Sequence, residues 1–79
     1  MFKKIVTTIQ HNGDVSGSIH GTNIGAGQVE ADMAQTRRAI RQDTESKGRV
    51  VHVEQTMTSL VVVYASGAVR VTQWVAASS

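Results

Sequence analysis

The stretch SLVVVYA, in the last third of the chain, constrains the fold more than any other part of the sequence. It is a near-continuous apolar run, which is typical of a strand at the centre of a sheet. Side chains alternate along a strand, so Leu60, Val62 and Tyr64 share one face. Val61 and Val63 lie on the other. Both faces of this strand are therefore apolar, and we expect other parts of the protein or a partner to shield each face from water.

Two more strands flank this run. RVVHVEQT, residues 49–56, alternates valines with a histidine and a glutamate. AVRVTQWV, residues 68–75, carries valines on one face and Arg70, Thr72 and Trp74 on the other. The connections between the three strands are too short for crossovers, so we expect an antiparallel meander.

The first quarter of the chain predicts a β-hairpin. Residues Phe2 to Gln10 are rich in isoleucine, valine and threonine, which favour strands. Asn12-Gly13 predicts a type I′ turn, in which both central residues have positive φ. A second, weaker strand follows over Val15 to His20, and Ser66-Gly67 predicts another tight turn near the end of the chain.

One helix is predicted between the hairpin and the meander. Residues Gln28 to Ser46 contain no proline or glycine and are mostly good helix formers. Val29, Met33, Thr36 and Ile40 recur at the spacing of a single helix face, which we expect to pack on the meander.

Glycines mark both ends of this helix. Gly21 to Gly27 form a predicted flexible connection, with Gly27 as the N-cap and Gly48 as the C-terminal stop. Gly25 and Gly27 precede a helix, where phosphate groups can bind. However, the residues after Gly27 match neither the P-loop nor the dinucleotide-binding pattern.

These elements predict a single α+β domain over residues 1–79. Its order is β-β-α-β-β-β, with an antiparallel sheet of four to five strands and one helix on one face. A helix on one side leaves the second apolar face uncovered. A chain this short also builds only a marginal core, and its lack of cysteine excludes disulfides. We therefore expect self-association as a homodimer, through Leu60, Val62, Tyr64 and Trp74.

No catalytic constellation is visible. His11, His20 and His52 are scattered without metal-ligand spacing, and no serine or cysteine nucleophile accompanies them in a recognisable pattern. His52 and Glu54 share a strand face, which is typical of a solvated pair. We predict a protein that is not an enzyme and that uses no cofactor or metal.

Five basic residues form the candidate partner-binding site: Arg37, Arg38, Arg41, Lys47 and Arg49. Two interpretations stay open. In the first, the basic residues are the solvated side of a helix, with Arg41 paired to Glu45. In the second, they contact phosphates or an acidic protein surface. The net charge of +2 permits a small nucleic-acid-binding module without arguing for one. No aromatic residues interleave with these arginines, so base stacking is not indicated.

The absence of cysteine fits a cytoplasmic protein. Polar residues interrupt the apolar run after the N-terminal lysines, so no signal peptide is predicted. No segment has the length of a membrane span.

The small single domain, with one helix followed by RVVHVEQTMTSLVVVYASGAVRVTQWV, resembles the small anti-CRISPR proteins of phages and prophages. This resemblance implies an inhibitor that binds a type I CRISPR effector complex in the host cytoplasm and blocks its engagement of target DNA. Many such inhibitors are acidic and imitate DNA, whereas this chain is basic. The resemblance therefore implies steric blocking of a protein surface rather than DNA mimicry.

Overall fold

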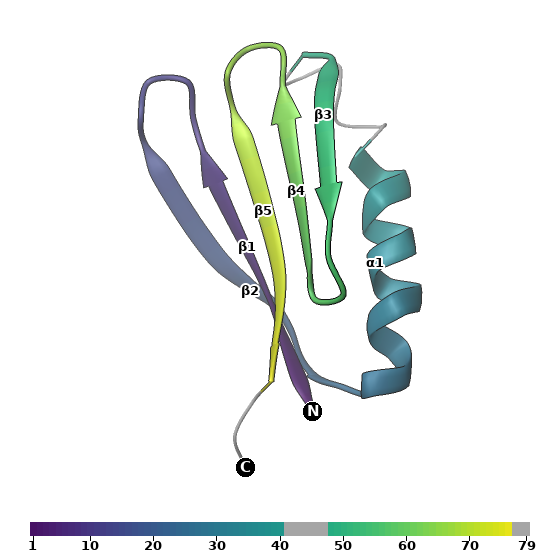
Figure 1. Cartoon of the computed structure of the whole chain (residues 1–79). Helices are drawn as coiled ribbons and strands as arrows, with labels where there is room; N and C mark the ends of the chain where they lie inside the picture. The colour runs from purple at the N-terminus through teal and green to yellow at the C-terminus, as the bar shows by residue number, and fades with distance from the viewer. Residues whose placement is uncertain (41–47, 77–79) are drawn as a thin grey trace.

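The computed structural model describes residues 1–40 and 48–76 of the chain. It contains one helix and one five-stranded sheet in the predicted order β-β-α-β-β-β, so the α+β assignment is confirmed (Figure 1). The elements are β1 (Phe2–Ile9), β2 (Val15–Ile24), α1 (Ala26–Ile40), β3 (Val50–Gln55), β4 (Ser59–Tyr64) and β5 (Val69–Ala76).

All strand pairs in the sheet are antiparallel, and their spatial order is β2-β1-β5-β4-β3. Strands β3, β4 and β5 form the predicted meander. The N-terminal strand β1 then pairs with the C-terminal strand β5 over their whole length, from Phe2–Ala76 to Ile9–Val69. This long-range pairing joins the N-terminal hairpin to the meander and places β5 at the centre of the sheet (Figure 1).

Helix α1 packs on one side of the sheet, which we call the covered face. Val29, Met33 and Ile40 are buried, as the helix periodicity predicts. They belong to one apolar cluster with residues from β4, β5 and the turn between them: Leu60, Val62, Tyr64, Ala68 and Trp74. Burying this cluster is the main source of stability for so short a chain.

The helix begins at Ala26, two residues earlier than predicted, and its cap is Gly25 rather than Gly27. The Gly25 backbone N–H donates to Gln28 Oε1 at 3.0 Å, and the Gln28 N–H donates to the Gly25 carbonyl at 2.9 Å. Gln28 therefore supplies the side-chain half of a capping box. The helix runs through Ile40, and its predicted end at Ser46 lies outside the described residues.

The β1–β2 turn and the β4–β5 turn each place a glycine directly after the two central residues of the turn. Gly13 has φ 93°, and its N–H donates to the Gln10 carbonyl at 2.9 Å. Gly67 has φ 94° and donates in the same way to the Tyr64 carbonyl. Asn12 has no positive φ, so the predicted type I′ turn is wrong. A glycine in the left-handed region after the turn closes the hairpin instead.

Two strands depart from the simple alternation. Strand β2 continues through Gly21 to Ile24, so most of the predicted flexible connection is a strand, with irregular pairing opposite Lys4. Strand β3 has a bulge between Val50 and His52. Val51, predicted to share a face with Val53, is the extra residue there and is exposed.

Candidate protein-binding face of the sheet

The side of the sheet opposite α1 is unusually apolar, and we call it the open face. Directly paired residues of an antiparallel sheet project from the same side, so the strand register identifies its members. Its aliphatic residues, all valine or isoleucine, are Ile5, Ile9, Val15, Ile19, Val61, Val63, Val69, Val71 and Val75. Of the described elements only α1 lies outside the sheet, and it packs on the covered face.

The register arranges these side chains in continuous rows across the strands. Val15 pairs with Ile9, Ile9 with Val69, and Val69 with Val63, which forms one aliphatic row over four strands. In the next row, Val71 pairs directly with Val61 at the middle of the sheet. The six aliphatic residues of these two rows are therefore contiguous. Thr7 continues the second row on β1, and Gln73 stands beside Ile5 in the row after it.

Solvent reaches much of this face. Among the described residues, seven large apolar side chains are exposed. Four of them belong to the open face: Ile9, Val15, Ile19 and Val75. Val15 and Ile19 keep 66% and 60% of their surface accessible. Single exposed apolar residues are ordinary, but a contiguous patch of this kind marks an interaction surface.

Polar side chains border the apolar rows. His52 and Glu54 project from β3 beside Val63 and Val61, and His52 Nε2 lies 3.2 Å from Glu54 Oε1. Both side chains are more than half exposed, as expected for a solvated pair. Lys3 lies near the start of β1, at one end of the face, paired with Val75. A mainly aliphatic patch whose charged residues lie at the border is a usual composition of a protein–protein interface.

The predicted self-association residues do not form this surface. Leu60, Val62, Tyr64 and Trp74 share one face, but that face is the one beneath α1, and each is at most 2% exposed. The prediction that they mediate self-association is therefore wrong. The helix selects this face because it carries the bulky side chains, which fill the space between a helix and a sheet better than valine does.

The five predicted basic residues do not form a compact site in the described part of the chain. Arg37 and Arg38 are exposed on α1, and Arg37 Nη1 donates to Gln55 Oε1 at 3.0 Å. Arg49 precedes β3, whereas Gln55 ends it. Six residues of strand span about 20 Å, so Arg37 and Arg49 lie towards opposite ends of β3.

The remaining basic residues of that prediction, Arg41 and Lys47, lie outside the described residues, as does the predicted Arg41–Glu45 pair. Only Arg37 and Arg38 are neighbours on a described element. The described structure thus supports an ordinary solvated helix surface around these two residues.

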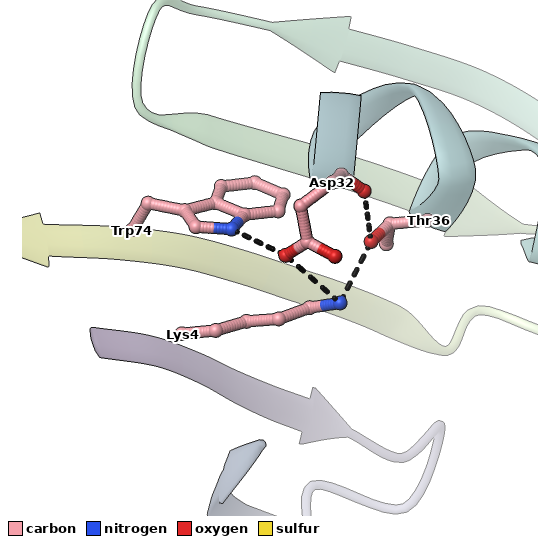
Figure 2. Close-up of polar contacts among 4 residues, drawn as sticks. All are labelled: Lys4, Asp32, Thr36 and Trp74. Atoms are coloured by element: carbon pink, nitrogen blue, oxygen red, sulfur yellow. Dashed lines mark hydrogen bonds and ion pairs between the residues drawn. The ribbon is translucent and has the colours of Figure 1, made fainter. Parts of the chain in front are cut away.

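A polar cluster that the sequence interpretation missed ties α1 to the sheet (Figure 2). The Trp74 indole Nε1–H donates to Asp32 Oδ2 at 2.8 Å, and Lys4 Nζ lies 3.5 Å from the same oxygen. Lys4 Nζ also donates to Thr36 Oγ1 at 2.8 Å. Thr36 in turn donates to the Asp32 carbonyl at 2.8 Å. One aspartate on the helix therefore joins β1 to β5 through charge and hydrogen bonding.

This cluster borders a groove of about 560 Å³ between α1 and the β1–β2 hairpin. Polar groups line much of the groove, including Thr8, Ser18, His20 and Gln35. Ser18 Oγ and His20 Nε2 lie 2.8 Å apart, so they hydrogen-bond to each other. Ser18 and His20 are thus occupied by each other, and Lys4, Asp32 and Thr36 by the polar cluster. We interpret the cluster as a structural anchor.

No protein-family model, curated protein or solved structure matches the chain. Within the described residues, no three acidic or histidine side chains are grouped to hold a metal ion. The described helix is neither long nor apolar enough to cross a membrane. The open face is therefore the feature from which a function can be argued.

Proposed function

We propose that this protein is a non-enzymatic protein-binding domain and that the open face is its binding surface. The observation that carries the proposal is the set of nine aliphatic residues on the side of the sheet away from α1, six of them in two adjacent rows. Apolar surface gains free energy when it leaves water, in proportion to the area buried. A sheet that keeps such a face in solvent gains stability when another protein covers it.

The shape of the surface favours a protein partner over a small molecule. Small-molecule sites are concave, whereas the open face is one side of a sheet whose side chains are valine and isoleucine. Lys3, His52 and Glu54 lie at its margins. The matching partner surface is apolar at its centre and polar at its border, as in other protein interfaces.

Inhibition of a type I CRISPR effector complex is the specific form of this proposal that the resemblance to anti-CRISPR proteins implies. A domain that covers a subunit surface blocks target DNA by steric exclusion and needs no acidic imitation of DNA. The chain's net charge of +2 is compatible with this mechanism. Host cytoplasm is the compartment in which such an inhibitor acts.

A pair of variants separates the open face from the helix arginines. Val61→Thr/Val71→Thr replaces two central methyl groups of the open face by hydroxyls and keeps β-branched side chains, which suit a strand. Arg37→Glu/Arg38→Glu reverses the charge of the exposed helix surface. Circular dichroism establishes that each variant is folded before its binding is compared.

The assay measures target-DNA binding by a type I effector complex in the presence of each purified variant. We expect wild type and Arg37→Glu/Arg38→Glu to inhibit equally, and Val61→Thr/Val71→Thr to lose inhibition. Wild-type protein that leaves DNA binding unchanged rejects the CRISPR form of the proposal. Inhibition that survives the valine changes but fails in the arginine variant places the contact on α1 instead.

Salt dependence separates protein binding from the nucleic-acid alternative. Phosphate contacts release counterions, so their affinity falls steeply as the salt concentration rises. An apolar interface loses much less. A nucleic-acid complex of this chain that forms at low salt and disappears at moderate salt supports the alternative. A protein complex that persists in high salt supports the open face.

A further inference from the structure

We infer that, in the isolated protein, a second copy of the chain covers the open face, so that two sheets stack into a two-fold symmetric sandwich. The inference rests on the proposed function in one respect: it assigns an occupant to the same surface. In this dimer each α1 lies on the outside, and the two open faces form a second apolar layer between the sheets. Symmetric self-pairing of one patch is the commonest form of protein oligomer.

The area of the open face matches what a stable dimer needs. Neighbouring strands lie about 4.8 Å apart, so five strands span about 24 Å. Strands of six to ten residues rise roughly 20–33 Å, and the described sheet therefore presents about 600 Å² on one side. Two copies bury about 1,200 Å² together, which reaches the range of specific protein interfaces.

The position of β5 fixes the symmetry axis. It is the central strand of five, so the two faces overlap fully only when the axis passes over β5. Val71 and its direct partner Val61 then lie at the middle of the interface. Two sheets that pack through valine and isoleucine side chains lie about 10 Å apart, as in other sandwiches.

Charge placement is compatible with this arrangement. The central rows of the open face carry no charged residue, whereas Lys3 and Glu54 project from its margins. No charge is therefore buried at the centre of a symmetric dimer, where an unpaired ion would be costly. The small size of the domain also favours a dimer, because chains of this length often gain stability by associating.

The same face cannot hold a second copy and another partner at once. Self-association and partner binding are therefore mutually exclusive, and the partner binds a monomer released from the dimer. Dilution below the dimer dissociation constant should strengthen apparent binding, since more of the competent monomer is present.

Sedimentation equilibrium over a range of concentrations tests the dimer. Wild type should fit a monomer–dimer equilibrium, and Val61→Thr/Val71→Thr should raise its dissociation constant roughly a thousandfold, because four hydroxyls replace buried methyl groups. The control is Met57→Gln, which removes an apolar side chain that is 91% exposed in the β3–β4 turn. It should leave the dissociation constant unchanged.

A cross-linking experiment tests the geometry. The chain contains no cysteine, so a single introduced cysteine is unique. In Val71→Cys, two thiols face each other across stacked sheets, too far apart for a disulfide but within reach of a bismaleimide of about 10 Å. Ala34→Cys, on the exposed side of α1, should not cross-link.

Each outcome supports or overturns the inference. A dimer that the threonine variant dissociates and that cross-links through Val71→Cys supports it. A wild-type monomer at high micromolar concentration overturns it and leaves the proposed binding of another protein standing. A dimer that survives the threonine changes also overturns it and indicates pairing through an edge strand, β2 or β3. A dimer of the predicted geometry, together with partner binding unaffected by the threonine changes, overturns the proposed function alone.

Discussion

Replacing Asp32 with alanine tests whether the polar cluster beneath α1 holds the helix on the sheet. In the wild type, Asp32 Oδ2 accepts the Trp74 indole N–H at 2.8 Å and lies 3.5 Å from Lys4 Nζ. Alanine leaves the indole N–H, on a side chain only 2% exposed, without this acceptor. It also removes the counter-charge of Lys4, which keeps its hydrogen bond to Thr36.

The expected loss of stability follows from these two effects. A buried donor left without a partner costs about 1–3 kcal/mol. The Lys4–Asp32 pair is partly exposed, at 17% and 28% of the two side chains, so its loss adds only about 1 kcal/mol. We expect Asp32→Ala to lower the free energy of unfolding by about 2–4 kcal/mol. For a domain of this size, the melting temperature should fall by roughly 10–30 °C.

Urea unfolding followed by tryptophan fluorescence measures this loss directly, because Trp74 is the only tryptophan of the chain. All variants are compared at one protein concentration, since association shifts apparent stability. Glu30→Ala is the control: it removes the same charge from an exposed position of α1 and should change stability by less than about 0.5 kcal/mol. Asp32→Asn keeps an acceptor for Trp74 and should fall between the two.

A double-mutant cycle that combines Asp32→Ala with Lys4→Met measures how much of the stability loss comes from the ion pair between these two residues. Removing both Lys4 and Asp32 should cost less than the sum of the single changes, by about 1 kcal/mol, because neither charge is then left alone. If Asp32→Ala unfolds at the same urea concentration as wild type, the cluster does not anchor the helix. The groove beside it would then need a different explanation.

Three other substitutions test the fold. Ile40→Asp places an unpaired charge at a position 4% exposed and should leave the chain unfolded by circular dichroism; a native melting curve would remove Ile40 from the core. Gly13→Ala meets no atom within 4 Å, so its cost is backbone strain at φ 93°, about 1 kcal/mol by denaturant titration, and an unchanged midpoint would contradict the turn geometry. Arg37→Glu/Arg38→Glu should change the free energy of unfolding by less than about 1 kcal/mol, and a larger loss would mean that the contact between Arg37 and Gln55 stabilises the fold.

Alternation along the strands predicted which side chains share a face, but it could not predict which face the helix covers. Both faces of β4 are apolar, so polarity alone does not separate them. Side-chain volume does: Leu60, Tyr64 and Trp74 lie beneath α1, whereas the open face carries only valine and isoleucine among its aliphatic residues. A comparison of side-chain volumes between the two faces would have predicted that Trp74 lies in the core.

The Lys4–Asp32–Trp74 cluster could not be predicted, because its members come together only through the pairing of β1 with β5. No local pattern encodes that pairing. One signal was present: Lys4 alternates with Phe2 and Val6, so it occupies an inward position of an otherwise apolar strand. An inward lysine requires an acceptor, and an acidic residue on the packed side of the helix is the natural candidate.

The helix cap, by contrast, has a recognisable pattern in the sequence, but the predicted cap lies two residues after the observed one. Gln28 stands three positions after Gly25, which is the spacing of a capping box. Glu30 follows Gly27 at the same spacing, so the sequence also favours Gly27 as the cap. The capping-box spacing therefore occurs twice in this glycine-rich stretch, and only the tertiary packing of the helix determines which glycine is the cap.

Solvent accessibility of the methyl groups on the open face, measured by NMR with a soluble paramagnetic agent, tests the central claim most directly. The buried methyls of Leu60 and Val62 serve as an internal reference, because the core protects them in every state. We expect the methyls of Ile5, Val61 and Val71 to be strongly relaxed in dilute protein and to become protected when a second copy or another protein binds. Methyls on the open face that stay equally accessible at every concentration, and in any complex the protein forms, would contradict the assignment of this face as the binding surface.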